Sequence, residues 1–160
     1  MHSPGIVDDL ERLARLVFEP KHLAADGTIE VGALRDVSGN GLSLQRRREG
    51  DGSSLVGRGN RMADEMNERS RVKAVQVDQP PVQHDRFIGI VELVAGAVRK
   101  HQAAGRRAFC VMDSAEADDS LHADIILNGR WSKTARSKLR NELRQLIVAL
   151  SLARISHTDE

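Results

Sequence analysis

Aromatic side chains are scarce in this chain. Its 160 residues include three phenylalanines and one tryptophan, and tyrosine does not occur. Modules that bind single-stranded nucleic acid by stacking need several aromatic faces, so the composition argues against a protein of that class. A hydrophobic core must then be built mainly from Leu, Val, Ile and Ala.

Cysteine is almost absent as well, and long apolar runs do not occur. Cys110 is the single cysteine, which excludes an intrachain disulfide and a cluster of thiolate metal ligands and fits a reducing compartment. No stretch approaches the roughly 18 consecutive apolar residues of a membrane-spanning helix. The N-terminal stretch carries acidic residues and lacks the apolar centre of a signal peptide. We therefore expect a soluble protein of the bacterial cytoplasm without a membrane partner.

An excess of charge of one sign is also missing. The net charge is +1 at pH 7, and the isoelectric point is near 8.0. Such a protein has no overall attraction to phosphate or to anionic membranes, so a partner of either kind needs a local patch of positive charge.

What the chain does have is the composition of a folded protein, with 40% hydrophobic and 29% charged residues. Its length predicts a single α+β domain over residues 1–153, followed by a frayed tail over 154–160. The architecture we expect is a small, mostly antiparallel sheet flanked by an N-terminal and a C-terminal amphipathic helix.

The first twenty residues predict the N-terminal helix. Ser3 and Pro4 are typical of a helix start, and Pro20 is typical of its end. The apolar positions of this stretch recur at helical spacing: Ile6, Leu10, Leu13 and Val17.

Two β-like runs follow, over residues 26–34 and 41–49. The Asn40-Gly41 pair tolerates the positive φ angles of a tight turn and predicts a hairpin between them. Residues 49–61 are rich in glycine and poor in apolar side chains, which is typical of a flexible loop. A phosphate cradle is the alternative for this loop, but the Gly-Lys-Ser/Thr ending of a P-loop is missing.

The middle of the chain is less regular. Residues 62–73 favour a short helix, and Pro80-Pro81 marks a break. A β-branched run then predicts a strand over 86–92, followed by a helix for which Gly105 is a suitable C-cap.

The last third predicts two buried strands and a helix. The strands cover residues 107–114 and 121–127, and Ser132 caps the final helix. Trp131 is expected to close over the end of the core. The helix presents a leucine stripe to the sheet: Leu139, Leu143, Leu146 and Leu150.

His122 and Asp124 form the best candidate for a catalytic pair. On a strand, side chains two residues apart share a face, and a carboxylate beside an imidazole orients the ring of a general base. The alternation predicts that Ala123, Ile125 and Leu127 face the core while His122 and Asp124 face outward. Adjacent same-face residues lie about 6.5 Å apart at their Cα atoms, which is long for a direct hydrogen bond. An ordinary polar outer face is therefore the alternative.

These residues support one enzymatic hypothesis, a toxin-like, metal-independent enzyme acting on RNA or a nucleotide. Such a reaction needs a base, an acid and positive charge to stabilise the phosphate. His122, a second histidine such as His84 or His22, and Arg46 are candidates for these roles.

A nucleic-acid-binding helix is a further hypothesis. The final helix and the turn before it carry basic residues that would face solvent and follow a phosphate backbone. They are Arg130, Lys133, Arg136, Arg140 and Arg144. A solvated helix face explains the same pattern.

The leading hypothesis from the sequence is nevertheless a non-enzymatic accessory protein that works within a larger assembly. No complete catalytic motif is present, and no cofactor or metal site is predicted. The apolar stripes of the terminal helices look wide for a domain of this size, which favours a protein partner or a homo-oligomer.

Overall fold

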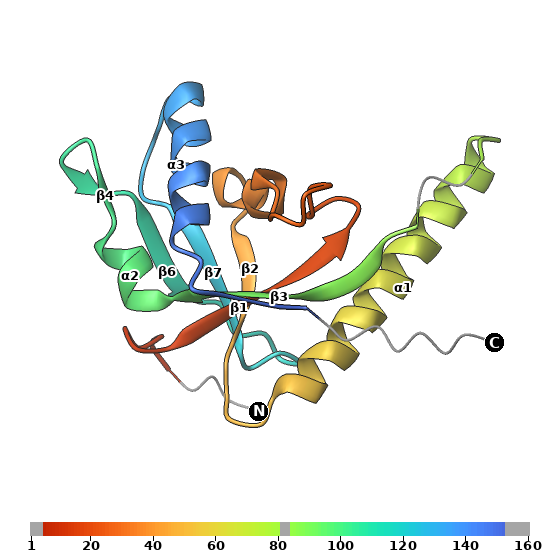
Figure 1. The fold of residues 1–160 in the computed structure, drawn as a ribbon, viewed down its shortest axis with the longest axis horizontal. Coiled ribbons are helices and arrows are strands. Elements are labelled where there is room, and N and C mark those ends of the chain that lie inside the picture. Colours follow the sequence, from red (N-terminus) through yellow and green to blue (C-terminus); the bar gives the residue numbers. More distant parts are fainter. Residues whose placement is uncertain (1–4, 81–83, 153–160) are drawn as a thin grey trace.

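The computed structural model describes residues 5–80 and 84–152 and shows an α+β fold built on a six-stranded sheet (Figure 1). The strands lie in the order β6-β7-β2-β1-β3-β8, and every neighbouring pair is antiparallel. Their bounds are β1 (Arg12–Glu19), β2 (Leu42–Arg46), β3 (Arg86–Val94), β6 (Phe109–Asp113), β7 (His122–Leu127) and β8 (Ala149–Leu152). The antiparallel α+β sheet expected from the sequence is confirmed.

Helices cover both faces of this sheet (Figure 1). The long helix α1 (Gly52–Gln76) packs on one face, over β1 and β3. The 3₁₀ helix η1 (Val31–Ser38), the short α2 (Ala95–Lys100) and α3 (Lys133–Gln145) lie on the other. A two-stranded hairpin of β4 (Gln102–Ala103) and β5 (Arg106–Arg107) projects beside α2.

The predicted N-terminal helix is wrong, because residues 12–19 form β1 near the middle of the sheet. Leu13 and Val17 pack toward the η1 and α3 side, whereas Ala14 and Leu16 pack toward α1. A strand buried on both faces is apolar nearly throughout, so its residues also satisfy a helical spacing. The expected cap at residues 3–4 lies outside the described residues.

The predicted hairpin is also wrong in its first half. Residues 31–38 form η1 rather than a strand, while residues 42–46 form β2 as expected. The Asn40-Gly41 pair therefore connects η1 to β2. The backbone N–H of Gly41, at φ +108°, donates to the carbonyl of Asp36 at 3.1 Å, which closes this loop.

The glycine-rich stretch 49–61 is not a flexible loop, since most of it forms the first turns of α1. Gly59 lies against Phe87 of β3, so closely that a Cβ atom at this position would overlap the aromatic ring. The absence of a side chain thus allows the helix to approach the sheet. Leu55, Ala63 and Ala74 continue the buried side of α1.

The second half of the chain follows the sequence predictions more closely. β3, α2, β6 and β7 lie where strands and a helix were expected, although α2 ends at Lys100. Ala104 and Gly105, both with positive φ, form the turn between β4 and β5, so Gly105 is not a helix cap. The Ser132 hydroxyl accepts a hydrogen bond from the Ala135 N–H at 3.1 Å and caps α3 as predicted.

The leucine stripe of the last helix is shorter than expected. Leu139 and Leu143 are buried against the sheet, but Leu150 belongs to β8 and is exposed. Trp131 packs against the edge of the core, and its indole N–H donates to the carbonyl of Asn128 at 3.0 Å. The expected tail at 154–160 lies outside the described residues.

Candidate pocket between two diverging strands

A pocket opens where β1 and β2 separate. These strands pair only at Leu13↔Arg46 and Ala14↔Gln45, although β1 is paired with β3 along its whole length. Beyond those pairs the sheet is open. A cavity of about 430 Å³ lies there, lined by β1, β2, β7, η1, the turn after β1, and α1. This volume is within the range typical of small-molecule sites.

His122 forms part of the wall contributed by β7. Its neighbours Ala123 and Ile125 face the core, so the predicted register holds. The side chain is only 14% exposed, however, because the face that it shares with Gln45 is partly covered by the start of α1.

Ser114 holds the His122 ring. The Nδ1 atom lies 3.2 Å from the Ser114 carbonyl oxygen and 2.9 Å from the Ser114 hydroxyl. The carbonyl only accepts, so the 3.2 Å contact favours the tautomer with the proton on Nδ1, whereas the closer hydroxyl can donate or accept. The lone pair is then on Nε2, which is the arrangement of a general base.

Asp124 does not orient this ring directly. Its carboxylate lies 4.0 Å from His122 Nδ1, beyond hydrogen-bond distance, as the spacing along a strand implies. It accepts a hydrogen bond from the Ser43 hydroxyl at 3.3 Å instead. The orienting role that the sequence suggested for Asp124 is therefore filled by Ser114.

His22 reaches the same pocket from the turn after β1 and has the opposite arrangement of protons. Its Nδ1 accepts a hydrogen bond from the Phe18 N–H at 3.2 Å, which leaves the proton on Nε2. Burial, with smaller effects from the positive charges of Arg15 and Lys21, lowers the pKa of His22 from 6.5 to about 4. His22 is thus a neutral hydrogen-bond donor at pH 7.

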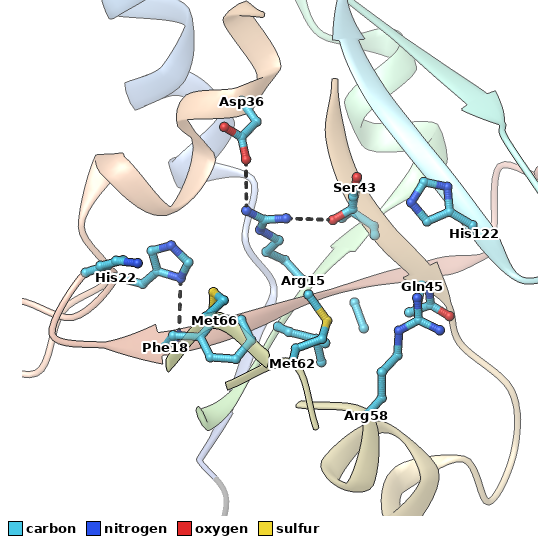
Figure 2. Close-up of a pocket in the computed structure, with 14 residues that line it drawn as sticks. Arg15, Phe18, His22, Asp36, Ser43, Gln45, Arg58, Met62, Met66 and His122 are labelled. Atoms are coloured by element: carbon cyan, nitrogen blue, oxygen red, sulfur yellow. Dashed lines mark hydrogen bonds and ion pairs between the residues drawn. The ribbon is translucent and has the colours of Figure 1, made fainter. Parts of the chain in front are cut away.

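Three cations line the pocket as well. Figure 2 shows the Arg15 guanidinium between His22 and His122, with Arg58 below it. Arg15 donates to Asp36 at 3.2 Å and to the Ser43 carbonyl at 3.0 Å.

The other two cations also have carboxylate partners within the described residues. Arg58 donates to Asp119 at 2.5 Å, and Lys21 donates to Asp85 at 2.7 Å. A guanidinium has five N–H donors, so these ion pairs fix the arginines and leave donors for a ligand. The Arg15 Nε–H is buried without a partner among the described residues, so the donors open to a ligand are those of the two terminal nitrogens.

Part of the pocket lining is apolar. Phe18 from β1 and Met66 from α1 lie near His22, and Met62 from α1 lies below Arg15 (Figure 2). Methionine side chains adapt to the shape of a flat group and are polarizable. The pocket lining therefore combines cations with an apolar surface suited to a ring.

Two of the predicted catalytic residues lie elsewhere. His84 is exposed just before β3 and does not line the pocket. Arg46 is 2% exposed and faces the opposite side of β2, where its guanidinium bonds both oxygens of Glu11 at 2.8 and 2.5 Å and the Gly5 carbonyl at 2.6 Å. Arg46 thus fixes the segment before β1.

The predicted basic row on the last helix is interrupted. Arg130, Lys133 and Arg136 are exposed, but Arg140 and Arg144 are half-buried beside η1 and the turn before it. Arg144 donates to the Ile29 carbonyl at 3.4 Å. The expectation of a continuous solvent-facing row is therefore wrong.

Comparison with known proteins does not place the chain in a family, since no family model, curated protein or solved structure matches it. Among the described residues, no group of three or more His, Cys, Asp or Glu side chains is placed to hold a metal ion. None of the helices in this described part is both long and apolar enough to cross a membrane.

Proposed function

We propose that the protein is an enzyme that acts on an RNA phosphodiester or a nucleotide in the pocket between β1 and β2. The observation that carries this proposal is the pair of histidines. His22 accepts at Nδ1 and so carries its proton on Nε2, while His122 is held at Nδ1 by Ser114, and among the described residues neither Nε2 has a partner. One pocket thus contains a base, a neutral donor and three cations.

The dimensions and the lining of the pocket favour a nucleotide unit. Phe18, Met62 and Met66 accommodate the base, while Arg15 and Arg58 face the phosphate with their remaining N–H groups. His22, beside the apolar residues, adds an uncharged N–H donor to the lining.

Cleavage of RNA follows from these positions. His122 Nε2 takes the proton of a ribose 2′-hydroxyl while the 2′-oxygen forms a bond to phosphorus. The bond from phosphorus to the 5′-oxygen of the next nucleotide breaks, and the Lys21 ammonium gives that oxygen a proton. The arginines keep their protons and stabilise the charge on the phosphate. The products are a 2′,3′-cyclic phosphate and a 5′-hydroxyl, and both side chains regain their initial protonation from solvent.

The test is incubation of the purified protein with short oligoribonucleotides and a chelator, with analysis of the 3′ ends. We expect cyclic phosphate products from the wild type and a rate about 10²–10⁴ lower for His122→Asn. His84→Asn is the matched control because His84 is exposed outside the pocket. It should cleave like the wild type, and a DNA oligonucleotide without the 2′-hydroxyl should stay intact. An inactive wild type, or a fully active His122→Asn variant, would refute the proposal.

The second candidate is the accessory protein favoured by the sequence. The observation behind it is β8, an edge strand with the exposed side chains Leu150 and Leu152. Exposed edges with apolar residues accept a strand from a partner protein. Light scattering over a dilution series and co-purification test this candidate, and a strict monomer that recovers no partner would speak against it.

A further inference from the structure

A second hollow, of about 570 Å³, lies between the end of η1 and α3. Arg35 and Ser38 from η1, Asn40 from the following loop and Arg140 from α3 contribute to its wall. Asp36 lines both this hollow and the pocket between β1 and β2, so the two sites are neighbours that share one carboxylate.

Arg140 is the unusual residue of this hollow. It is half-buried, yet among the described residues no carboxylate pairs with it and no acceptor takes its hydrogen bonds. Its Nε–H is shielded from solvent without a partner, and the same is true of the Ser38 hydroxyl. Arg144, one turn along the same helix, differs because it donates to the Ile29 carbonyl.

The balance of charge at this place is positive. Among the described residues that line the wall, Arg35 and Arg140 are the cations and Asp36 is the carboxylate. A second carboxylate, that of Asp124, lies beside Gly41 and accepts a hydrogen bond from Ser43. Asp36 is already paired with Arg15 at 3.2 Å. Partial burial of a guanidinium without a counter-charge is unfavourable, and an anion bound beside it removes much of that cost.

We propose that this hollow is a phosphate-binding site. Two guanidinium groups from separate elements match the charge of a phosphate dianion, and the planar Arg140 group bonds two of its oxygens. Small rearrangements bring the Ser38 hydroxyl into the same coordination. The phosphate is either the free ion or a phosphate group of a larger ligand. The site shares no cation or histidine with the proposed catalytic pocket, so each stands without the other.

Titration of the full chain with inorganic phosphate at constant ionic strength tests the site, with binding measured by calorimetry and sodium chloride as the blank. We expect Arg140→Gln to weaken phosphate binding roughly tenfold or more, and Ser38→Ala to weaken it several-fold. Arg140 forms no ion pair within the described residues. The thermal midpoint of the Arg140→Gln variant should therefore stay at or above that of the wild type.

Two control variants make the result specific. Arg136→Gln removes an exposed charge from the same helix, and Arg58→Gln removes a cation from the other pocket. Both should bind phosphate like the wild type. Equal binding by wild type and Arg140→Gln, or an absence of phosphate binding, would overturn the proposal, whereas loss in Arg58→Gln alone would assign the ion to the other pocket and overturn it too.

A competition experiment identifies the source of the phosphate. A five-nucleotide RNA is added to phosphate-saturated His122→Asn protein, in which the proposed cleavage does not occur. If the RNA displaces the phosphate that is bound through Arg140, the hollow takes a phosphate group of an RNA chain. If the phosphate stays bound, the hollow takes the free ion.

Discussion

Substitution of Gly59 by alanine tests the contact that brings α1 onto the sheet. A Cβ atom at this position would overlap three ring carbons of Phe87, a side chain that is 5% exposed. Gly57, two residues earlier in the same helix, is the matched control. Its added Cβ would meet only the Arg61 side chain, at 3.5 Å, which is an ordinary contact.

The two variants share one contribution and differ in the other. Alanine is favoured over glycine inside a helix by about 1 kcal/mol, so Gly57→Ala should stabilise the protein by about that amount. Gly59→Ala gains the same helix propensity but adds an overpacking cost of roughly 1–3 kcal/mol. The difference between the two free energies of unfolding should therefore be about 1–3 kcal/mol, since the propensity contribution cancels.

Urea denaturation of both variants measures this difference through the midpoints at a constant m-value. Adding Phe87→Leu to Gly59→Ala should recover part of the loss, because the smaller side chain relieves the overlap. Equal stabilisation by both alanine substitutions, or no effect of either as in a flexible loop, would refute the packing of α1 on Phe87.

Three further predictions concern stability. Leu143→Ala should lower the unfolding free energy by about 2–5 kcal/mol in urea, since Leu143 is fully buried; a loss below 1 kcal/mol would contradict its place in the core. Glu11→Gln should cost about 3 kcal/mol, because Arg46 loses its close carboxylate partner and keeps only Asp113, at 3.8 Å. The pKa of Glu11 is lowered to about 2, chiefly by the Arg46 hydrogen bond. The wild type should therefore be more stable than Glu11→Gln by the full amount above pH 4.5, and this difference in unfolding free energy should disappear as the pH falls from 4.5 to 2. His22, with its pKa lowered to about 4, should make the wild type lose stability as the pH falls from 6.5 to 4, by at most about 1.4 kcal/mol per pH unit. His22→Asn should lack that slope, and an unchanged slope would mean that His22 titrates normally.

The sequence predicts most of the second half of the fold and little of the first. β6 and β7 are short apolar runs with turn residues on both sides, and Ser132 marks the start of α3 through a local hydrogen bond. Such signals depend on neighbouring residues alone. β1 could not be assigned in this way, because burial on both faces removes the alternation that identifies a strand.

The same reason limits what could be predicted of the pocket. His122 can be predicted because its register on β7 follows from local alternation. The sequence puts Arg15 within the expected N-terminal helix and Arg58 within the expected loop 49–61, so it joins neither residue to His122. The glycines of α1 argue against a helix unless the contact between Gly59 and Phe87 is known, and that contact is tertiary. Two errors in local structure thus concealed most of the pocket.

The place of β8 in the sheet has a consequence for synthesis on the ribosome. β3 is covered on one side by β1, and its other side is covered by residues 149–152. While the chain emerges, β1 and β3 can pair long before β8 has been made, so the apolar β3 presents an open edge during that interval. Newly made chains on one messenger are close together, and open edges can join them. The rate at which residues 95–152 are translated therefore sets how long this protein is most exposed to aggregation.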